Sequence, residues 1–144
     1  MKIIECPRDA MQGISEFIAT DIKAAYINQL LKVGFDTIDF GSFVSPKAIP
    51  QLKDTAQVLA QLDLENTNSK LLSIIANTRG ATDACKFHQI NYLGFPLSVS
   101  EEFFSFNGSV DFATFSQSFN SSELSFRLFI LATRSPTNGP STQN

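Results

Sequence analysis

Short apolar runs alternate with helix-like patterns from Met1 to about Glu102. Each run is bounded by polar residues or turn formers, which is the pattern of buried strands. The runs predict strands at residues 3–6, 37–40, 71–76 and 91–97. Between them, apolar residues spaced three or four apart predict helices at residues 20–33, 50–62 and 79–89.

The first long helix has recognisable ends. Thr20 is predicted as its N-cap, because a hydroxyl oxygen can accept a hydrogen bond from a free backbone N–H group of the first turn. Gly34 stands where helices commonly end with a positive φ. The residues predicted to share its buried face are Ile22, Ala25, Tyr26, Ile27, Leu30 and Leu31.

Strands that alternate with helices predict parallel pairing, because a parallel neighbour requires a crossover connection. We therefore expect an α/β fold with about four parallel β-α units and an irregular C-terminal tail. Such units are either half of a barrel, that is a partial TIM (β/α)8 barrel, or a small open sheet, because a complete barrel needs about 250 residues. Residues 1–102 are expected to form these units. Residues 103–144 form a divergent Phe/Ser-rich tail, in which only 124–132 could be a buried strand and 135–144 should be disordered.

The composition changes near residue 103 and limits the choice of partners. All seven lysines precede residue 87, whereas eight of the fourteen phenylalanines follow residue 102. A net charge of -3, with no lysine among the tail aromatics, argues against nucleic acid as a partner. No apolar run is long enough to cross a membrane. Cys6 and Cys85 are expected to be buried thiols, and without a secretory signal the expected location is cytoplasmic.

Polar side chains follow every predicted strand, and in parallel β/α folds these loops meet at one ligand-binding rim. Arg8 is a permanent cation that can hold a carboxylate or carbonyl oxygen, and Asp9 is a hard oxygen ligand suited to Mg²⁺ or Mn²⁺. An Arg-Asp pair at a strand end is also common as a surface ion pair, so the pair alone does not define a site. Further rim candidates are Gln12, Asp39, Ser42, Ser45, Asn77, Arg79, Ser98, Ser100 and Glu101.

Two longer motifs resemble the 3-hydroxy-3-methylglutaryl-CoA (HMG-CoA) lyase family of metal-dependent TIM barrels. Pro7-Arg8-Asp9-Ala10-Met11-Gln12 is similar to the Pro-Arg-Asp-Gly-Leu-Gln that ends the family's first strand. After the second strand, Ser42-Phe43-Val44-Ser45-Pro46-Lys47 and then Pro50-Gln51 are similar to the family's Ser-Phe-Val-Ser-Pro-Lys and Pro-Gln. Asn77 matches the family's asparagine after the third strand. The resemblance covers residues 1–102, the N-terminal half of the family's barrel.

The resemblance implies a reaction and a role for each residue. The family cleaves HMG-CoA to acetyl-CoA and acetoacetate with a divalent cation, a step of leucine catabolism. Asp9 would bind Mg²⁺ or Mn²⁺, and Arg8 would stabilise the enolate that forms as the C–C bond breaks. Asp39, which replaces the family's usual glutamate, would be a second catalytic residue that orients Arg8 or a water. The residues implied to bind the acyl-CoA substrate are Gln12, Ser42 and Asn77.

Part of the family's site has no counterpart in this sequence. The family completes its metal site with His-x-His and an asparagine and supplies a catalytic cysteine from a glycine-rich loop, but this chain has a single histidine and none of these motifs. One carboxylate cannot hold Mg²⁺ in a defined geometry. We therefore expect an incomplete ligand set and a truncated lyase that is inactive as isolated. A frameshift near Phe103 would explain the change in composition, and the downstream coding DNA would test it.

Other functions and assemblies remain open from the sequence. A half barrel leaves its first and fourth strands with an unpaired edge, which the tail or a second chain in a homodimer would cover. A related Claisen-type acyl-CoA synthase, of the isopropylmalate or homocitrate kind, shares the Arg-Asp of the first strand. A non-catalytic α/β module that binds an acyl-CoA or a protein is the alternative outside this superfamily.

Overall fold

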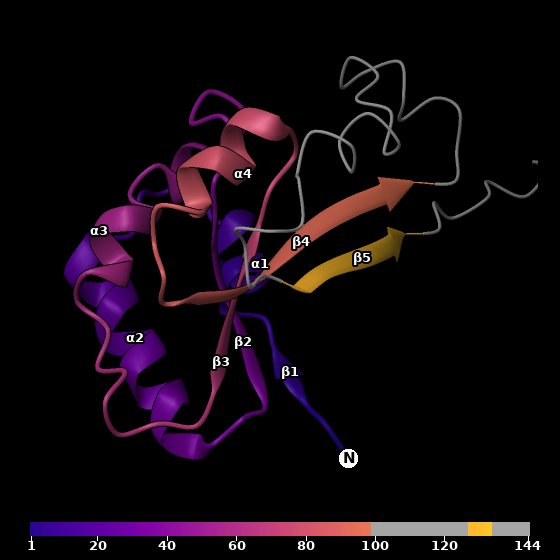
Figure 1. Cartoon of the computed structure of the whole chain (residues 1–144). Coiled ribbons are helices and arrows are strands. Elements are labelled where there is room, and N and C mark those ends of the chain that lie inside the picture. The colour runs from indigo at the N-terminus through magenta and orange to yellow at the C-terminus, as the bar shows by residue number, and fades with distance from the viewer. Residues whose placement is uncertain (99–126, 134–144) are drawn as a thin grey trace, which may run out of the picture.

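The described residues form a parallel sheet with strand order β1-β2-β3-β4-β5 (Figure 1). The computed structural model describes residues 1–98 and 127–133, with side chains up to Phe95. Each strand lies beside the next one along the chain, so the predicted parallel β-α units are confirmed. The strands are β1 (Ile4–Glu5), β2 (Thr37–Ser42), β3 (Lys70–Ile74), β4 (Ile90–Ser98) and β5 (Arg127–Thr133).

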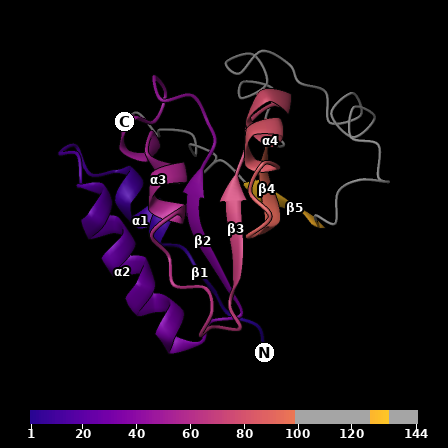
Figure 2. The ribbon, with the colours of Figure 1, turned by 60° about the vertical axis from the view of Figure 1, so that its left-hand side comes forward.

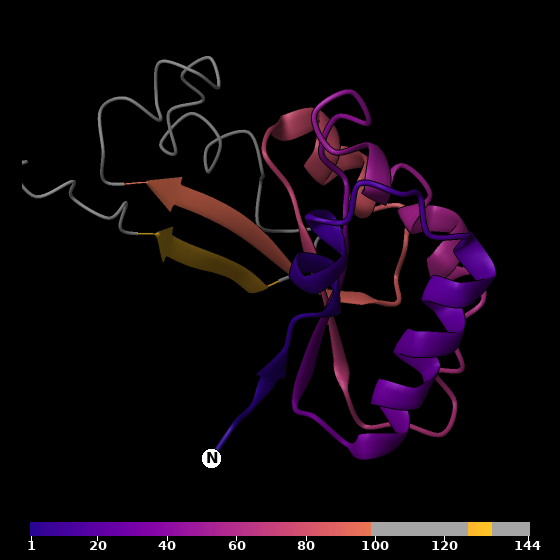
Figure 3. The same ribbon diagram turned by 180° about the vertical axis from the view of Figure 1, so that it is seen from behind.

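Helices cover one face of this sheet, and a short helix follows β1 at its edge. Figures 1 and 2 show α2, α3 and α4 on the same side of the strands, while Figure 3 shows α1 at the carboxyl end of β1. None of the helices in the described part of the chain is long and apolar enough to span a membrane. The helices are α1 (Pro7–Gln12), α2 (Thr20–Val33), the 3₁₀ helix η1 (Pro50–Leu52), α3 (Thr55–Leu59) and α4 (Thr78–Ala84).

The predicted buried face of α2 is only partly right. Ile27 and Leu31 are buried as expected, but Ile22 and Tyr26 are 59% and 42% exposed. The buried side of the helix instead contains Lys23, which is 1% exposed. Lys23 turns inward because its ammonium group binds Asp54 at 2.7 Å, a partner that apolar periodicity cannot reveal.

The ends of α2 also differ in part from the prediction. Gly34 follows the helix with φ of 85°, so the predicted C-terminal end is confirmed. Thr20 is the first helical residue and not the N-cap, which is Ala19. The Thr20 hydroxyl donates to Asp54 Oδ2 at 2.7 Å instead, so it joins the same buried polar group as Lys23.

The single helix predicted at 50–62 is two shorter helices, η1 and α3, separated by a turn. Two side-chain bonds hold this turn. The Thr55 hydroxyl donates to the Leu52 carbonyl at 2.8 Å, and it accepts a hydrogen bond from the Ser42 N–H at 3.1 Å. The helix predicted at 79–89 likewise ends early, because α4 stops at Ala84 and a turn leads into β4.

The core lies between the sheet and its helices. Its central side chains are less than 3% exposed, among them Ile27, Ile38, Phe40, Leu71 and Ile75. Cys6 is exposed, so its predicted burial is wrong: the chain leaves the sheet at this residue to enter α1. Cys85 is half-buried beside the core.

The tail is described only at β5, which pairs in parallel with β4 and overlaps the segment 124–132 predicted as a strand. The predicted irregular parts, including residues 135–144, lie outside the described residues.

Candidate active site

Arg8 and Asp39 meet because β1 ends beside the middle of its parallel neighbour β2. Glu5 of β1 lies opposite Ile38 of β2, so the chain that follows Glu5 passes beside Asp39. It enters α1 at once, with Pro7 in the first turn, where the missing N–H of proline leaves no hydrogen bond unmade. Arg8 is thereby presented from α1 toward Asp39, the third residue of β2.

The two side chains form a largely buried, charge-assisted pair. Arg8 Nη2 lies 2.7 Å from Oδ2 of Asp39, and Nε lies 3.1 Å from the same oxygen. The Asp39 side chain is 3% exposed and that of Arg8 is 13% exposed. Hydrogen bonds between two charged groups are short and strong, and a guanidinium held through two nitrogens cannot rotate freely. Asp39 therefore fixes the direction of the Arg8 side chain.

The third guanidinium nitrogen, Nη1, contacts more exposed oxygens. It donates to Asp9 Oδ1 and to Gln12 Oε1, at 3.0 Å in each case. The Asp9 side chain is 70% exposed, and an exposed ion pair contributes little net free energy. Nη1 can consequently exchange these partners for the oxygen of a ligand. We call this group of side chains the Arg8 cluster; its members are Arg8, Asp9, Gln12 and Asp39.

Burial and charge shift the pKa values within the cluster. Burial raises the pKa of the Asp39 carboxyl, and the hydrogen bonds and charge of Arg8 offset this only in part. Burial by itself would lower the pKa of Arg8, but its hydrogen bonds to Asp39 and the charge of that carboxylate outweigh burial and raise it. Arg8 is thus a fixed cation at the carboxyl end of β1.

Ser42 and Asn77, two of the predicted substrate residues, use their side-chain oxygens to order their own loops. Ser42 Oγ accepts a hydrogen bond from the Val44 N–H at 3.1 Å. Asn77 Oδ1 accepts one from the Gly80 N–H at 2.9 Å, which makes Asn77 the N-cap of α4. Both residues lie at the same edge of the sheet as Arg8, but their side-chain oxygens accept hydrogen bonds only two or three residues away within the described part of the chain.

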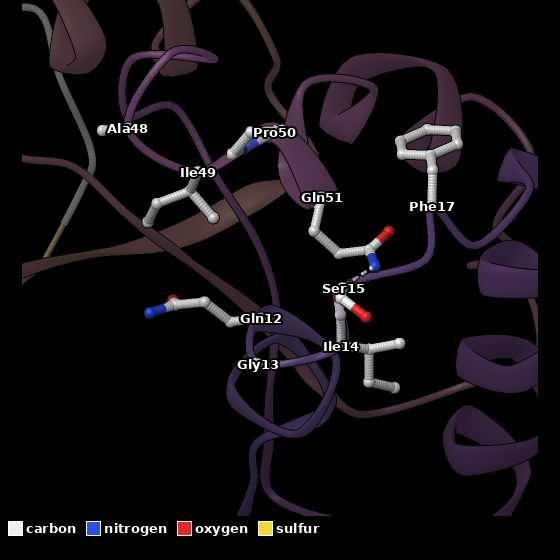
Figure 4. A pocket seen from close by; sticks show the side chains of 9 residues that line it. All are labelled: Gln12, Gly13, Ile14, Ser15, Phe17, Ala48, Ile49, Pro50 and Gln51. Atoms are coloured by element: carbon white, nitrogen blue, oxygen red, sulfur yellow. Dashed lines mark hydrogen bonds between the residues drawn. The ribbon is translucent and has the colours of Figure 1, made fainter.

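A pocket of about 380 Å³ opens beside Gln12 (Figure 4). Gln12 belongs both to this pocket and to the Arg8 cluster, so the pocket adjoins the guanidinium. One wall is the segment between α1 and α2, and the other is the segment that leads into η1. The lining residues are Gln12, Gly13, Ile14, Ser15, Phe17, Ala48, Ile49, Pro50 and Gln51.

Gln51 is a pocket residue to which the sequence analysis assigned no role. Figure 4 shows its side chain reaching the backbone of the opposite wall, where Nε2 donates to the Ile14 carbonyl at 3.0 Å. The available signal was the Pro50-Gln51 dipeptide of the family motif. Nothing in the dipeptide tells which backbone the amide will bind.

The described residues do not provide a complete metal site. No group of three or more His, Cys, Asp or Glu side chains within residues 1–95 could hold a metal ion. Asp9 offers one exposed carboxylate, whereas a divalent cation such as Mg²⁺ needs several fixed oxygen ligands. The donor set of this region therefore does not fit a resident metal centre.

Comparison with known proteins finds HMG-CoA lyases. The chain is 38% identical over 78 residues to hydroxymethylglutaryl-CoA lyase YngG of Bacillus subtilis, which covers 54% of this chain and 26% of the relative. It is 43% identical over 60 residues to the cytoplasmic 3-hydroxy-3-methylglutaryl-CoA lyase of Rattus norvegicus, covering 41% of this chain and 18% of the relative. No protein-family model matches the chain.

Solved structures agree with this resemblance. An HMG-CoA lyase described as from Acenitobacter baumannii, in complex with coenzyme A and 3-methylmalate, matches with a TM-score of 0.72 and 30% identity, over 92% of this chain and 44% of that one. The Bacillus subtilis HMG-CoA lyase matches with a TM-score of 0.75 and 30% identity, over 90% and 45%. The predicted resemblance and the partial-barrel fold are thus confirmed. The chain spans less than half the length of these relatives.

Proposed function

We propose that this chain carries the N-terminal part of the active-site rim of an HMG-CoA lyase-like protein. The reaction of the complete site is cleavage of HMG-CoA to acetyl-CoA and acetoacetate. One observation carries the proposal: Asp39 fixes the Arg8 guanidinium next to an open pocket, and the bonds of Nη1 within residues 1–95 are to exposed oxygens.

Arg8 would act on the charge that develops during cleavage. When the C–C bond breaks, the electrons collect on the thioester oxygen as an enolate, and a guanidinium already in position stabilises that charge without reorganising. Asp39 acts through Arg8, by holding Nε and Nη2 so that Nη1 faces the ligand. The shorter aspartate reaches Arg8 here, so the replacement of the family's glutamate does not prevent this contact.

Asp9 would supply one oxygen ligand to Mg²⁺ or Mn²⁺, and the other ligands would have to come from outside residues 1–95. We therefore expect no turnover from this chain alone. Gln12, Ser42 and Asn77 are assigned to the acyl-CoA side of the rim, and Gln12 is best placed because it lines the pocket. The same proposal includes a cytoplasmic location and a role in leucine catabolism. It also includes a homodimer that covers the free strand edges.

Titration with acetyl-CoA tests the binding half of this proposal. We expect binding that weakens about tenfold or more in Arg8→Gln, because a charge-assisted bond to a thioester or carboxylate oxygen contributes about 1.5–3 kcal/mol. Lys32→Gln is the matched control, since Lys32 is exposed in the last turn of α2, away from the rim, and the two variants have the same net charge. Equal affinities of the two variants would overturn the assignment of Arg8.

A non-catalytic acyl-CoA-binding module is the second candidate, and the incomplete ligand set among the described residues favours it. Such a module would bind acetyl-CoA without a divalent cation and would retain its affinity in Asp9→Ala. The lyase reading predicts instead that Mg²⁺ or Mn²⁺ strengthens binding through Asp9, and that Asp9→Ala removes this effect.

A further inference from the structure

The wall of the pocket formed by residues 13–18 lacks the usual backbone support. Within this segment, the backbone bond given by the structure is from the Ile14 N–H to the Met11 carbonyl, at 3.0 Å. The segment belongs to neither α1 nor α2 and pairs with no strand. Something other than secondary structure must hold it in place.

A single side chain, that of Gln51, provides this support. Its Oε1 accepts from the Ile18 N–H at 2.9 Å, and its Nε2 donates to the carbonyls of Ile14 and Glu16, at 3.0 and 2.7 Å. A primary amide has two N–H donors, and both are used here. Gln51 is 5% exposed, so water cannot easily replace these bonds.

Gln51 is itself held by the buried ion pair between Lys23 of α2 and Asp54. The Lys23 ammonium group donates to the Gln51 backbone carbonyl and to Asp54 Oδ1, the latter at 2.7 Å. The same ammonium lies 4.1 Å from the centroid of the Phe17 ring, and the ammonium of Lys53 lies 4.3 Å from it. The backbone of the wall is thus tied to η1 through Gln51, and its Phe17 ring contacts one cation from α2 and one from the C-cap of η1.

We propose that Gln51 is the positioning residue of this pocket: it clamps the 13–18 wall and so keeps the space beside Gln12 and Arg8 open to an acyl-CoA thioester. The choice of ligand rests on the proposed function, whereas the clamp rests on the three backbone bonds alone. Gln51 contacts neither Arg8 nor Asp39 in the bonds described above, so it acts through the wall and is not a catalytic residue.

Hydrogen exchange of the wall, followed by mass spectrometry, tests the clamp. The change is Gln51→Met, which keeps the length of the side chain and removes all three bonds. The matched control is Asn28→Leu, because the Asn28 amide also clamps a loop backbone, donating to the Gln61 carbonyl at 3.0 Å and accepting from the Asp63 N–H at 2.8 Å, away from the pocket. We expect exchange in residues 14–18 to accelerate about tenfold or more in Gln51→Met and to stay unchanged in Asn28→Leu.

The unsubstituted chain provides a test that does not depend on the variant folding. The Ile18 amide should be protected from exchange although its acceptor is a side chain. Exchange of the Ile18 amide at the free-peptide rate, or wall exchange unchanged in a folded Gln51→Met, would overturn the clamp.

Titration of the same proteins with acetyl-CoA separates the clamp from the ligand. Weaker binding in Gln51→Met, with the affinity retained in Asn28→Leu, supports the positioning role. Faster wall exchange with unchanged acetyl-CoA affinity overturns it. If the unsubstituted chain binds no acetyl-CoA while the exchange results hold, the proposed function fails and the clamp stands.

Discussion

Arg8 and Asp39, 31 residues apart in sequence, are joined through two guanidinium nitrogens to one carboxylate oxygen, at 2.7 and 3.1 Å. The pair links α1, the short helix after β1, to the third residue of β2, so it joins a helix to the sheet as well as two charges. It leaves Nη1 facing the exposed Asp9 and Gln12. The stability of the pair and the availability of Nη1 are therefore separate properties that can be tested separately.

Replacing Asp39 should destabilise the fold. Asp39→Asn leaves the mostly buried Arg8 without its counter-charge, and removal of one partner of a buried pair costs about 3–5 kcal/mol, less here because Arg8 keeps some solvent contact. Asp9→Asn is the control and should cost less than about 1 kcal/mol, since the Asp9 side chain is largely exposed. Urea unfolding measures the free energy of unfolding of both variants. Equal decreases would show that the Arg8–Asp39 pair stabilises the fold no more than the exposed Arg8–Asp9 pair does.

The reactivity of Cys6 should report the charge of Asp39. Although Cys6 is an exposed residue, partial desolvation of its thiol and then the negative charge of Asp39 raise its pKa, while Arg8 lowers it. Asp39→Asn removes one raising influence and leaves Arg8, so the pKa of Cys6 falls and more thiolate is present at a given pH. Alkylation by iodoacetamide at pH 8 should accelerate at Cys6.

Cys85 is the internal reference for this experiment, because burial alone raises the pKa of its thiol. Its alkylation rate should stay unchanged in Asp39→Asn. A Cys6 rate that also stays unchanged would mean that Asp39 carries no charge in the folded protein.

The buried lysine of α2 should matter far more than a surface lysine with the same bond length. Lys23 and Lys86 each place Nζ 2.7 Å from an aspartate oxygen, but their side chains are 1% and 66% exposed. Lys23→Met leaves Asp54 buried without a cation and should lower stability by about 3 kcal/mol or more. Lys86→Met should leave the unfolding midpoint almost unchanged. Comparable midpoints for the two variants would contradict this account of Lys23.

Gly80 should tolerate no side chain. A Cβ at this position would lie 2.4 Å from the Phe43 carbonyl oxygen, a backbone atom that cannot move aside cheaply. Gly80→Ala should therefore destabilise by about 1–3 kcal/mol. Gly13→Ala is the control, because nothing lies within 4 Å of its Cβ position and its φ is -82°, so it should be neutral or slightly stabilising. Thermal melting compares the two, and a neutral Gly80→Ala would show that α4 does not pack closely against Phe43.

The strand order and the position of Arg8 beside Asp39 could be anticipated, because both depend on local signals. Apolar runs mark the strands, and parallel strands bring their carboxyl ends to one edge. The inward turn of Lys23 could not be anticipated from periodicity, which places lysine on the surface. It depends on Asp54, 31 residues away.

The role of Gln51 could not be predicted either, although the Pro50-Gln51 dipeptide matched the family motif. Gln51 acts by binding three backbone groups of a segment that lies 33–37 residues earlier in the chain. The family motif likewise pointed to Ser42 and Asn77 as ligand residues, while the structure records their oxygens in a loop bond and a helix cap. A match to a family motif picks out such residues. Only their contacts in the structure tell whether they support a loop or touch a ligand.

The most direct test of the central claim is acetoacetate release from HMG-CoA by a mixture of this chain with the C-terminal half of the Bacillus subtilis lyase, in the presence of Mg²⁺. The account predicts no turnover from either piece alone and turnover from the mixture, abolished by Arg8→Gln and retained in Lys32→Gln. Turnover that is the same with Arg8→Gln, or no turnover from a mixture that forms a complex by size-exclusion chromatography, would contradict it.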